Sequence, residues 1–188
     1  MNFFRFRESV SGLIWGKLLG LFLAGSRGHL RIVAPLKFIL LKRIFIGDNV
    51  RINAGCWLQV HNKSGELKIG TGSIIGHSNH IYAYRSIMIG ENVLTADKVY
   101  ITDCLHDYED PNTPIMFQDV KALEKVIIGN NSWLGENVVI LGASIGKNCV
   151  IGANSVVTKD IPDYSIAAGV PAKIIKKYNH TLKTWVKV

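Results

Sequence analysis

The chain has 188 residues, of which 48% are hydrophobic and 19% charged, so it is a folded protein with one domain rather than two. Its formal net charge of +8 is unevenly distributed along the chain. Residues 1–50 hold eight Lys/Arg and two Asp/Glu, residues 51–170 hold nine Lys/Arg and twelve Asp/Glu, and residues 171–188 hold five Lys and no Asp/Glu. Basic ends indicate anionic partners such as phosphates or a lipid surface, and the lack of a nucleic-acid-binding motif disfavours DNA or RNA.

The N-terminal segment, residues 1–45, is predicted to begin with an amphipathic helix. Residues 10–24 form an apolar run broken by Lys17. This run of about fifteen residues is shorter than the roughly twenty that span a bilayer. Its apolar residues recur at helical spacing, at Val10, Leu13, Ile14, Leu18, Leu21 and Phe22. Residues 25–45 show no clear repeat, and we expect them to lead irregularly into the rest of the fold.

Three interpretations of this helix are open. The first is that its apolar stripe packs on the domain. The second is contact with a membrane surface, because basic residues could meet anionic headgroups. Those residues are Arg5, Arg7, Lys17 and Arg27. The third, a cleaved signal peptide, is weaker, because Glu8 and Lys17 disturb the usual charge layout.

From residue 46 the sequence repeats with a period of six. Examples are "IGDNVR" from residue 46, "IGENVL" from 89, "IGNNSW" from 128, "LGENVV" from 134, "IGKNCV" from 145 and "IGANSV" from 151. A strand alternates every two residues and a helix recurs near 3.6, so this period fits neither alone. A unit with two inward positions and a Gly or Asn corner predicts a short strand followed by a bend. Three units would close a triangular coil, and stacked coils would form a prism filled with ladders of aliphatic side chains.

Residues 103–125 are the only long break in this repeat, and loops of that length in a compact domain are usually functional. The open ends of a solenoid need caps. We expect the N-terminal helix to cover one end, and the residues after Pro162 to cover the other or to lie along a side. The predicted division is therefore 1–45 for the helix and lead-in, and 46–188 for the repeat domain with its tail.

Two stretches carry family motifs: "IGENVLTADKVYITDCLHDYEDPNTPI" at 89–115 and "SVVTKDIPDYSIAAGVPAKII" at 155–175. Together with residues 126–154 they resemble the hexapeptide-repeat acyltransferases, in particular the maltose, galactoside and polysaccharide O-acetyltransferase branch. The first 45 residues do not match the maltose and galactoside enzymes. The resemblance implies a mainly β fold, a left-handed parallel β-helix. It also implies a homotrimer with active sites between subunits, acetyl-CoA as co-substrate, and no metal.

His106 lies in the break and is the candidate catalytic residue. In the family a histidine at the matching position acts as general base on the acceptor hydroxyl. The chemistry agrees, because an unactivated alcohol is a poor nucleophile and a histidine titrates near neutral pH. Carboxylates follow at Asp107, Glu109 and Asp110, and Asp103 is our candidate for orienting the ring. From the residues alone, a solvated loop histidine is an equal alternative.

The resemblance also places acetyl-CoA along residues 134–177. The residues expected to contact it are Trp133, Gly142, Ala153, Thr158, Lys159, Lys173 and Lys176. Gly142 would admit the pantetheine arm close to the backbone, and Lys173 and Lys176 match basic positions near the phosphates. A solvated basic tail and a surface aromatic are the alternatives for the lysines and for Trp133. The step "ILGAS" at 140–144 is one residue short, which predicts a tighter corner.

The acceptor is expected to be a sugar hydroxyl of a cell-surface polysaccharide or glycan. Asn79, Tyr84 and Arg85 are the candidate acceptor residues. Galactoside enzymes have a carboxylate where Tyr84 stands, so the acceptor should differ from theirs.

Other interpretations stay open at this point. Within the family they are acetylation of an antibiotic, of serine or of an amino sugar. Outside it they are a zinc carbonic anhydrase-like enzyme, suggested by His77, His80 and His106, and a non-enzymatic scaffold. Three cysteines without a CxxC pair favour the cytoplasm, with the inner face of the membrane as a peripheral location.

Overall fold

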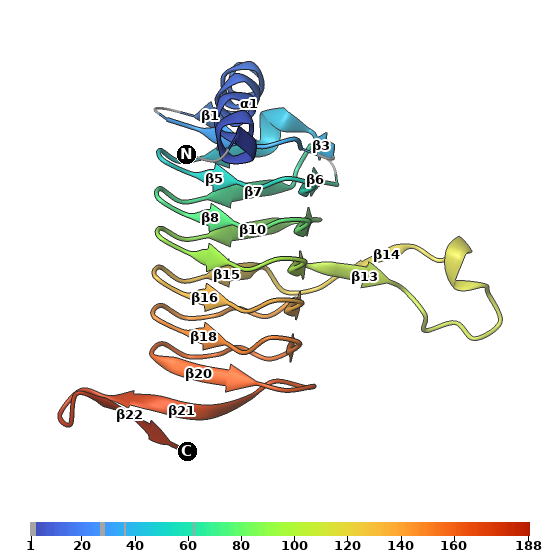
Figure 1. Ribbon diagram of the computed structural model, residues 1–188. Helices are drawn as coiled ribbons and strands as arrows, with labels where there is room; N and C mark the ends of the chain where they lie inside the picture. Colours follow the sequence, from blue (N-terminus) through green and yellow to red (C-terminus); the bar gives the residue numbers. More distant parts are fainter. Residues whose placement is uncertain (1–2, 27–28, 36, 62) are drawn as a thin grey trace.

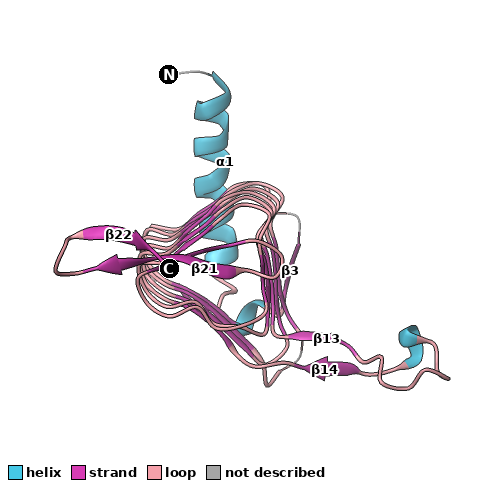
Figure 2. Cartoon of the chain, turned by 90° about the horizontal axis from the view of Figure 1, so that it is seen from below, coloured by secondary structure: helices cyan, strands magenta, loops and turns pink. Residues whose placement is uncertain are grey.

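The computed structural model describes residues 3–26, 29–35, 37–61 and 63–188. The chain forms a parallel β-solenoid of about seven turns, with one helix at its N-terminal end and an antiparallel extension at its C-terminal end (Figure 1). Seen along its axis, the solenoid has a triangular section (Figure 2). The mainly β repeat fold predicted from the period of six is therefore confirmed.

Each side of the triangle is one sheet of stacked strands. Face 1 contains β1 (Gly25–Ser26), β4 (Ile44–Ile46), β7 (Glu66–Ile69), β10 (Ser86–Ile89) and β15 (Val126–Ile128). Face 2 contains β2 (Arg31–Ile32), β5 (Arg51–Ile52), β8 (Ile74–Ile75), β11 (Leu94–Thr95), β16 (Trp133–Leu134), β18 (Val150–Ile151) and β20 (Ser165–Ala168). Face 3 contains β3 (Lys37–Ile39), β6 (Trp57–Val60), β9 (His80–Ala83), β12 (Tyr100–Thr102), β17 (Val139–Leu141) and β19 (Val156–Val157).

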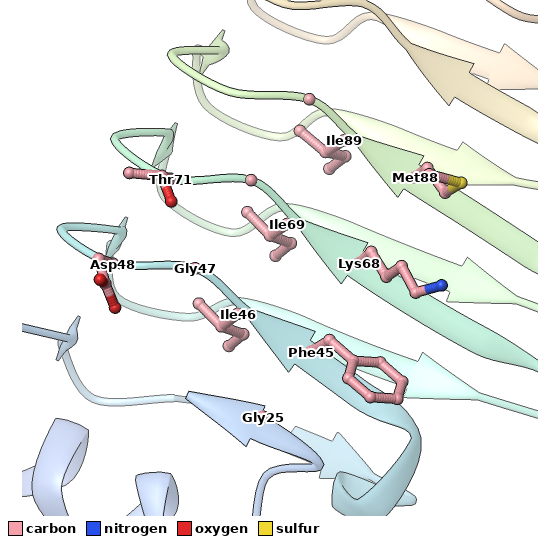
Figure 3. A pocket seen from close by; sticks show the side chains of 12 residues that line it. Gly25, Phe45, Ile46, Gly47, Asp48, Lys68, Ile69, Thr71, Met88 and Ile89 are labelled. Carbon is pink, nitrogen blue, oxygen red and sulfur yellow. The ribbon is translucent and has the colours of Figure 1, made fainter. Parts of the chain in front are cut away.

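The core is a set of aliphatic ladders inside the prism. Ile46, Ile69 and Ile89 occupy the same register on successive coils of face 1, and each is 2% exposed (Figure 3). Burying an isoleucine contributes about 1.5–3 kcal/mol, so the ladders supply much of the stability. The residue before each isoleucine points outward, as Lys68 and Met88 do in Figure 3.

Asparagine residues form many of the corners between faces. Six of them adopt a left-handed backbone, with φ between +52° and +62°. They are Asn49, Asn92, Asn131, Asn137, Asn148 and Asn154. Asparagine tolerates this conformation better than most side chains, which is why the repeat uses it at the fourth position. This agrees with the corners expected from the sequence.

The predicted N-terminal helix is present as α1 (Phe3–Gly20), which lies across one end of the solenoid (Figures 1 and 2). The helix packs on the domain, as the first interpretation expected, but it does so through Gly12 and Gly16, which are buried, while its apolar stripe is exposed. Among the described residues, no helix is both long and apolar enough to cross a bilayer. Arg27 and the side chains of Arg5 and Arg7 lie outside the described part of the chain.

The segment expected to be an irregular lead-in is the first coil of the solenoid. β1, β2 and β3 pair in parallel with β4, β5 and β6 of the next coil, and a 3-10 turn, η1 (Leu41–Arg43), closes it. Ile32 is fully buried in the same ladder as Ile52. The coils therefore begin at Gly25, about twenty residues before the six-residue repeat can be recognised in the sequence.

The predicted break is a two-stranded ribbon that projects from the corner between faces 3 and 1 (Figures 1 and 2). It consists of β13 (Cys104–His106), a 3-10 turn η2 (Ile115–Phe117) and β14 (Val120–Ala122). At the other end of the chain, β21 (Lys173–Asn179) and β22 (Thr184–Lys187) extend face 2 in antiparallel fashion. The C-terminal tail thus covers the free edge of β20.

Candidate active site

His106 is the last residue of β13 and is exposed, where it pairs with Val120 of β14. Main-chain hydrogen bonds close the ribbon at its base, from Leu123 N to Asp103 O, and at its outer end, from Asp107 N to Asp119 O, both 2.8 Å. A cavity of about 170 Å³ lies between the ribbon and face 3. It is lined by Tyr82, Tyr100, Cys104, Leu105, His106 and Val120. The histidine ring therefore faces a small concave surface with two phenols.

Asp103 has a different task from the one predicted. Its side chain is fully buried, and its two carboxylate oxygens accept hydrogen bonds from the main-chain N–H groups of Tyr84 (2.5 Å), Arg85 (2.7 Å) and Ser86 (2.7 Å). Within the described residues it forms no hydrogen bond with His106. Asp103 therefore fixes the corner at 84–86 against the base of the ribbon, and does not orient the histidine ring by contact.

The acidic residues after His106 fold the tip of the ribbon. Asp107 Oδ1 accepts hydrogen bonds from the main-chain N–H groups of Tyr108 and Glu109, at 2.8 and 3.2 Å. Glu109 pairs with Lys121 of the opposite strand at 2.8 Å. Asp110 accepts hydrogen bonds from the residues that follow it, which lowers the pKa of its carboxyl. These carboxylates stabilise the loop and leave the histidine ring available.

A row of aromatic rings crosses face 3 beside this cavity. Trp57, His80 and Tyr100 stand in register on three successive coils. The Trp57 and His80 rings stack with centroids 4.3 Å apart, and the His80 and Tyr100 centroids are 5.2 Å apart. Burial lowers the pKa of His80 and raises the pKa of Tyr100. The row is thus aromatic and half-buried, which suits contact with a sugar ring.

A second polar pair completes this wall. His61 Nδ1 and the hydroxyl of Tyr82 are 2.5 Å apart, and the His61 ring lies 4.6 Å from that of Tyr84. Burial raises the pKa of Tyr82. Sequence reasoning did not single out His61 or Tyr100, because their neighbours come from other coils. The signal that could have found Tyr100 is its spacing of one coil from His80.

The structure brings half of the predicted site residues to one edge of the prism. Along the corner between faces 3 and 1 lie Tyr84, Arg85, Asp103, Gly142, Thr158 and Lys159. Gly142 adopts φ +54° at the five-residue step, and a Cβ there would collide with Leu123 of the ribbon. This is the tight corner predicted from the short repeat.

The remaining predicted residues lie elsewhere on the chain. Trp133 is on face 2, Ala153 is at the corner between faces 2 and 3, and Lys173 and Lys176 are on β21. Asn79 is fully buried, and its amide donates to the carbonyls of His77 and Ala96. It is an internal corner residue, so the prediction that it lines the acceptor site is wrong.

No group of three or more His, Cys, Asp or Glu side chains is placed to hold a metal ion within the described ranges. His77 instead pairs with Asp97, at 3.1 Å. All three cysteines are free and buried. Burial raises the pKa of the Cys56 thiol to about 11.

Known proteins share these features. A family model described as the hexapeptide repeat of succinyl-transferase matches residues 125–159. The proposed lipopolysaccharide biosynthesis O-acetyltransferase WbbJ of Escherichia coli K12 is 50% identical over 151 residues, which cover 77% of this chain and 76% of WbbJ. A solved galactoside acetyltransferase in complex with coenzyme A is 28% identical with a TM-score of 0.64, covering 92% of this chain and 76% of that one.

A third relative was solved with a sugar nucleotide. It is a mutant of AntD, an N-acyltransferase from Bacillus cereus, in complex with dTDP-4-amino-4,6-dideoxyglucose and coenzyme A. It is 25% identical with a TM-score of 0.71, covering 88% of this chain and 90% of that one. The repeat and the solenoid define a hexapeptide-repeat protein. The chain belongs to the hexapeptide-repeat acetyltransferases, and it is therefore an acyltransferase.

Proposed function

We propose that this protein transfers the acetyl group of acetyl-CoA to a sugar hydroxyl of a cell-surface polysaccharide or glycan. The observation that carries the proposal is the exposed His106 ring beside a cavity walled by Tyr82 and Tyr100. Relatives named for lipopolysaccharide and galactoside O-acetylation support the acceptor class. The free, buried cysteines favour a reducing compartment, so we place the reaction in the cytoplasm.

In this proposal His106 is the general base. Acetyl-CoA supplies an activated acyl group, and the acceptor hydroxyl must lose its proton as it attacks. The imidazole takes that proton and later returns it to the leaving thiolate. Tyr82, Tyr100 and the stacked rings beside them hold the sugar against face 3, with Tyr84 and Arg85 at the adjoining corner.

Most of the residues proposed to contact acetyl-CoA fit its chemistry. Ala153 is small and exposed, and Thr158, Lys159 and Lys173 are exposed too, whereas the space beside Gly142 is filled by Leu123 of the same chain. Lysine binds phosphate as a point charge. These residues lie at two different corners of one prism, so a single chain does not gather them. In a homotrimer, one of these corners on one prism would face the other corner on the neighbouring prism. We propose that assembly as the active form.

The ribbon supports the same assembly. Its tip carries Ile115, Met116 and Phe117, which are 55%, 77% and 72% exposed. Gln118 Nε2 donates to the carbonyls of Asp110 and Thr113, so hydrogen bonds within the loop hold the tip in shape in the single chain. An ordered apolar tip held away from its own prism is suited to docking on a neighbouring subunit.

The test is an acetyl-transfer screen that follows coenzyme A release against nucleotide sugars and glycan fragments, with serine and an aminoglycoside as the competing acceptors. We expect turnover with a glycan or nucleotide sugar. His106→Gln should lower it by about 10² or more with acetyl-CoA binding retained, because proton transfer contributes that much. His180→Gln, a second exposed histidine, is the matched control. Near wild-type turnover in His106→Gln would refute the general base, and preference for serine or the aminoglycoside would refute the acceptor class.

A further inference from the structure

α1 contacts the body of the protein through glycine. Gly12 and Gly16 are buried, and a Cβ at Gly16 would overlap the main-chain carbonyl of Leu30. A Cβ at Gly12 would lie 2.8 Å from Cγ of Arg31. Because these two positions have no side chain, the helix backbone lies directly against the first coil. The larger side chains are therefore left on the opposite side of the helix.

That opposite side is apolar and uncovered. Seven large hydrophobic side chains of α1 and the turn after it are 42–80% exposed. They are Val10, Leu13, Ile14, Trp15, Leu18, Leu21 and Phe22. Figure 2 shows the N-terminal part of α1 extending beyond the triangular outline of the solenoid, while its C-terminal turns lie over the end of the prism. A contiguous apolar surface of this kind marks a docking site.

The charge around this surface indicates the partner. Residues 9–47 contain six Lys/Arg and no acid. Lys17 and Lys42 are exposed, and no ion pair joins the described cations of this stretch to another described side chain. A partner must therefore offer both apolar groups and negative charge. A bilayer with anionic headgroups offers both at once.

A groove beside the helix also combines apolar side chains with a positive charge. Its volume is about 260 Å³, and it lies where α1 meets residues 29–30. It is lined by Leu13, Gly16, Lys17, Gly20, Leu21, His29 and Leu30. Leucine side chains can contact the acyl chain of a lipid, and the neighbouring lysine can contact its phosphate. A long lysine side chain can place its charge in the headgroup region while its aliphatic stem stays among apolar groups.

We propose that α1 is an interfacial helix that lies in the plane of an anionic membrane. The helix runs across the end of the solenoid, roughly perpendicular to its axis (Figures 1 and 2), so the prism would stand upright on the bilayer. The apolar side chains enter the acyl region, and Lys17 reaches the phosphates. This inference goes beyond acetyl transfer and does not depend on it.

The test is co-sedimentation of the full chain with phosphatidylcholine vesicles that contain or lack phosphatidylglycerol. We expect binding to the anionic vesicles, weakened by added salt because exposed charges are screened. The variant Leu18→Gln/Leu21→Gln/Phe22→Gln should lower the partition coefficient by at least about tenfold, since three exposed apolar side chains no longer enter the lipid. Brominated acyl chains should quench the fluorescence of Trp15, and Trp15→Phe should lose that quenching.

The matched control is Ile175→Gln/Leu182→Gln/Val188→Gln, which changes three exposed apolar side chains near the C-terminus and should bind as wild type does. Light scattering on both variants separates a membrane face from a subunit contact. Failure of the wild type to bind anionic vesicles would overturn the proposal, as would equal binding by the α1 variant. A smaller subunit assembly in the α1 variant would also overturn it, because the face would then be covered by another copy.

Discussion

At the scale of single residues, the buried carboxylate of Asp103 connects the ribbon to the corner at residues 84–86, which we propose as the acceptor side of the site. Three main-chain N–H groups donate to it, and a carboxylate accepts such bonds more strongly than a neutral group. Asp103→Asn would turn an amide N–H₂ toward one of these donors and leave that donor unpaired in the interior. We expect a loss of about 2–4 kcal/mol in the free energy of unfolding, measured by urea titration.

The control for this prediction is Asp119→Asn, because Asp119 is an exposed acid of the same ribbon. Its free energy of unfolding should stay within about 0.5 kcal/mol of wild type. If Asp103→Asn folds, the displaced corner at Tyr84 and Arg85 should also raise the KM for the acceptor more than it lowers kcat. Equal stability of the two variants would contradict the role that the structure gives to Asp103.

The same residue shows what the sequence could and could not predict about the site. The repeat drew attention to His106, because it lies in the one long break, but the role of general base came from the family resemblance and stays a prediction. The hydrogen bonds of Asp103 to the main chain of residues 84–86 could not be predicted. The side chains of Asp103 and Asn79 both point inward, and the direction of a side chain depends on the register of its coil. Tyr82 and Tyr100 line one cavity only because successive coils stack, and no local pattern of the sequence shows that.

At the scale of elements, α1 contains a glycine whose replacement by alanine should loosen the helix from the domain, although the same replacement usually stabilises a helix. Replacing a helical glycine by alanine normally stabilises a helix by about 1 kcal/mol. At Gly16 the added Cβ would overlap the carbonyl of Leu30, which is backbone and has little freedom to move. We therefore expect Gly16→Ala to release α1 from the first coil. Hydrogen exchange of the α1 amides should show faster exchange in this variant.

Gly12→Ala is the matched comparison, because its new Cβ would meet the side chains of Arg31 and Val33 and no backbone atom. Side chains can adjust more than a main-chain carbonyl can, so we expect exchange of the α1 amides to rise less in Gly12→Ala than in Gly16→Ala. Faster exchange in Gly12→Ala and not in Gly16→Ala would contradict this account of the contact. Neither variant alters the outward apolar side, so both should still bind anionic vesicles.

The elements of the fold were largely predictable from residue 46 onward, because inward aliphatics and Asn corners recur every six residues. The first coil was not, since residues 25–45 replace the repeat with an αL Leu40 and a 3-10 turn while keeping strand register. The direction of α1 was also missed. Helical spacing identifies an apolar stripe, but it does not say that glycines on the other side can approach the body more closely.

At the scale of the whole molecule, exposed apolar rows predict where subunits meet. On face 2, Ile74, Leu94 and Trp133 stand in register on three coils and are 39%, 44% and 49% exposed. A solvated row of this kind is costly, and Trp133 is also proposed to border the acetyl-CoA cleft. We therefore expect this row to be buried between subunits of a trimer. Light scattering should give about three times the chain mass of 20.8 kDa.

Leu94→Glu tests that assembly, because a carboxylate in the middle of the row would be buried without a partner if the subunits met there. We expect the mass to fall to that of one chain, and acetyl transfer to be lost with it, since the two corners that hold the proposed acetyl-CoA residues would no longer face each other. Leu182→Glu, at an exposed leucine of the C-terminal turn, should keep both the mass and the activity. A Leu94→Glu monomer that transfers acetyl groups at the wild-type rate would place the complete site within one chain, and the inter-subunit cleft would have to be abandoned.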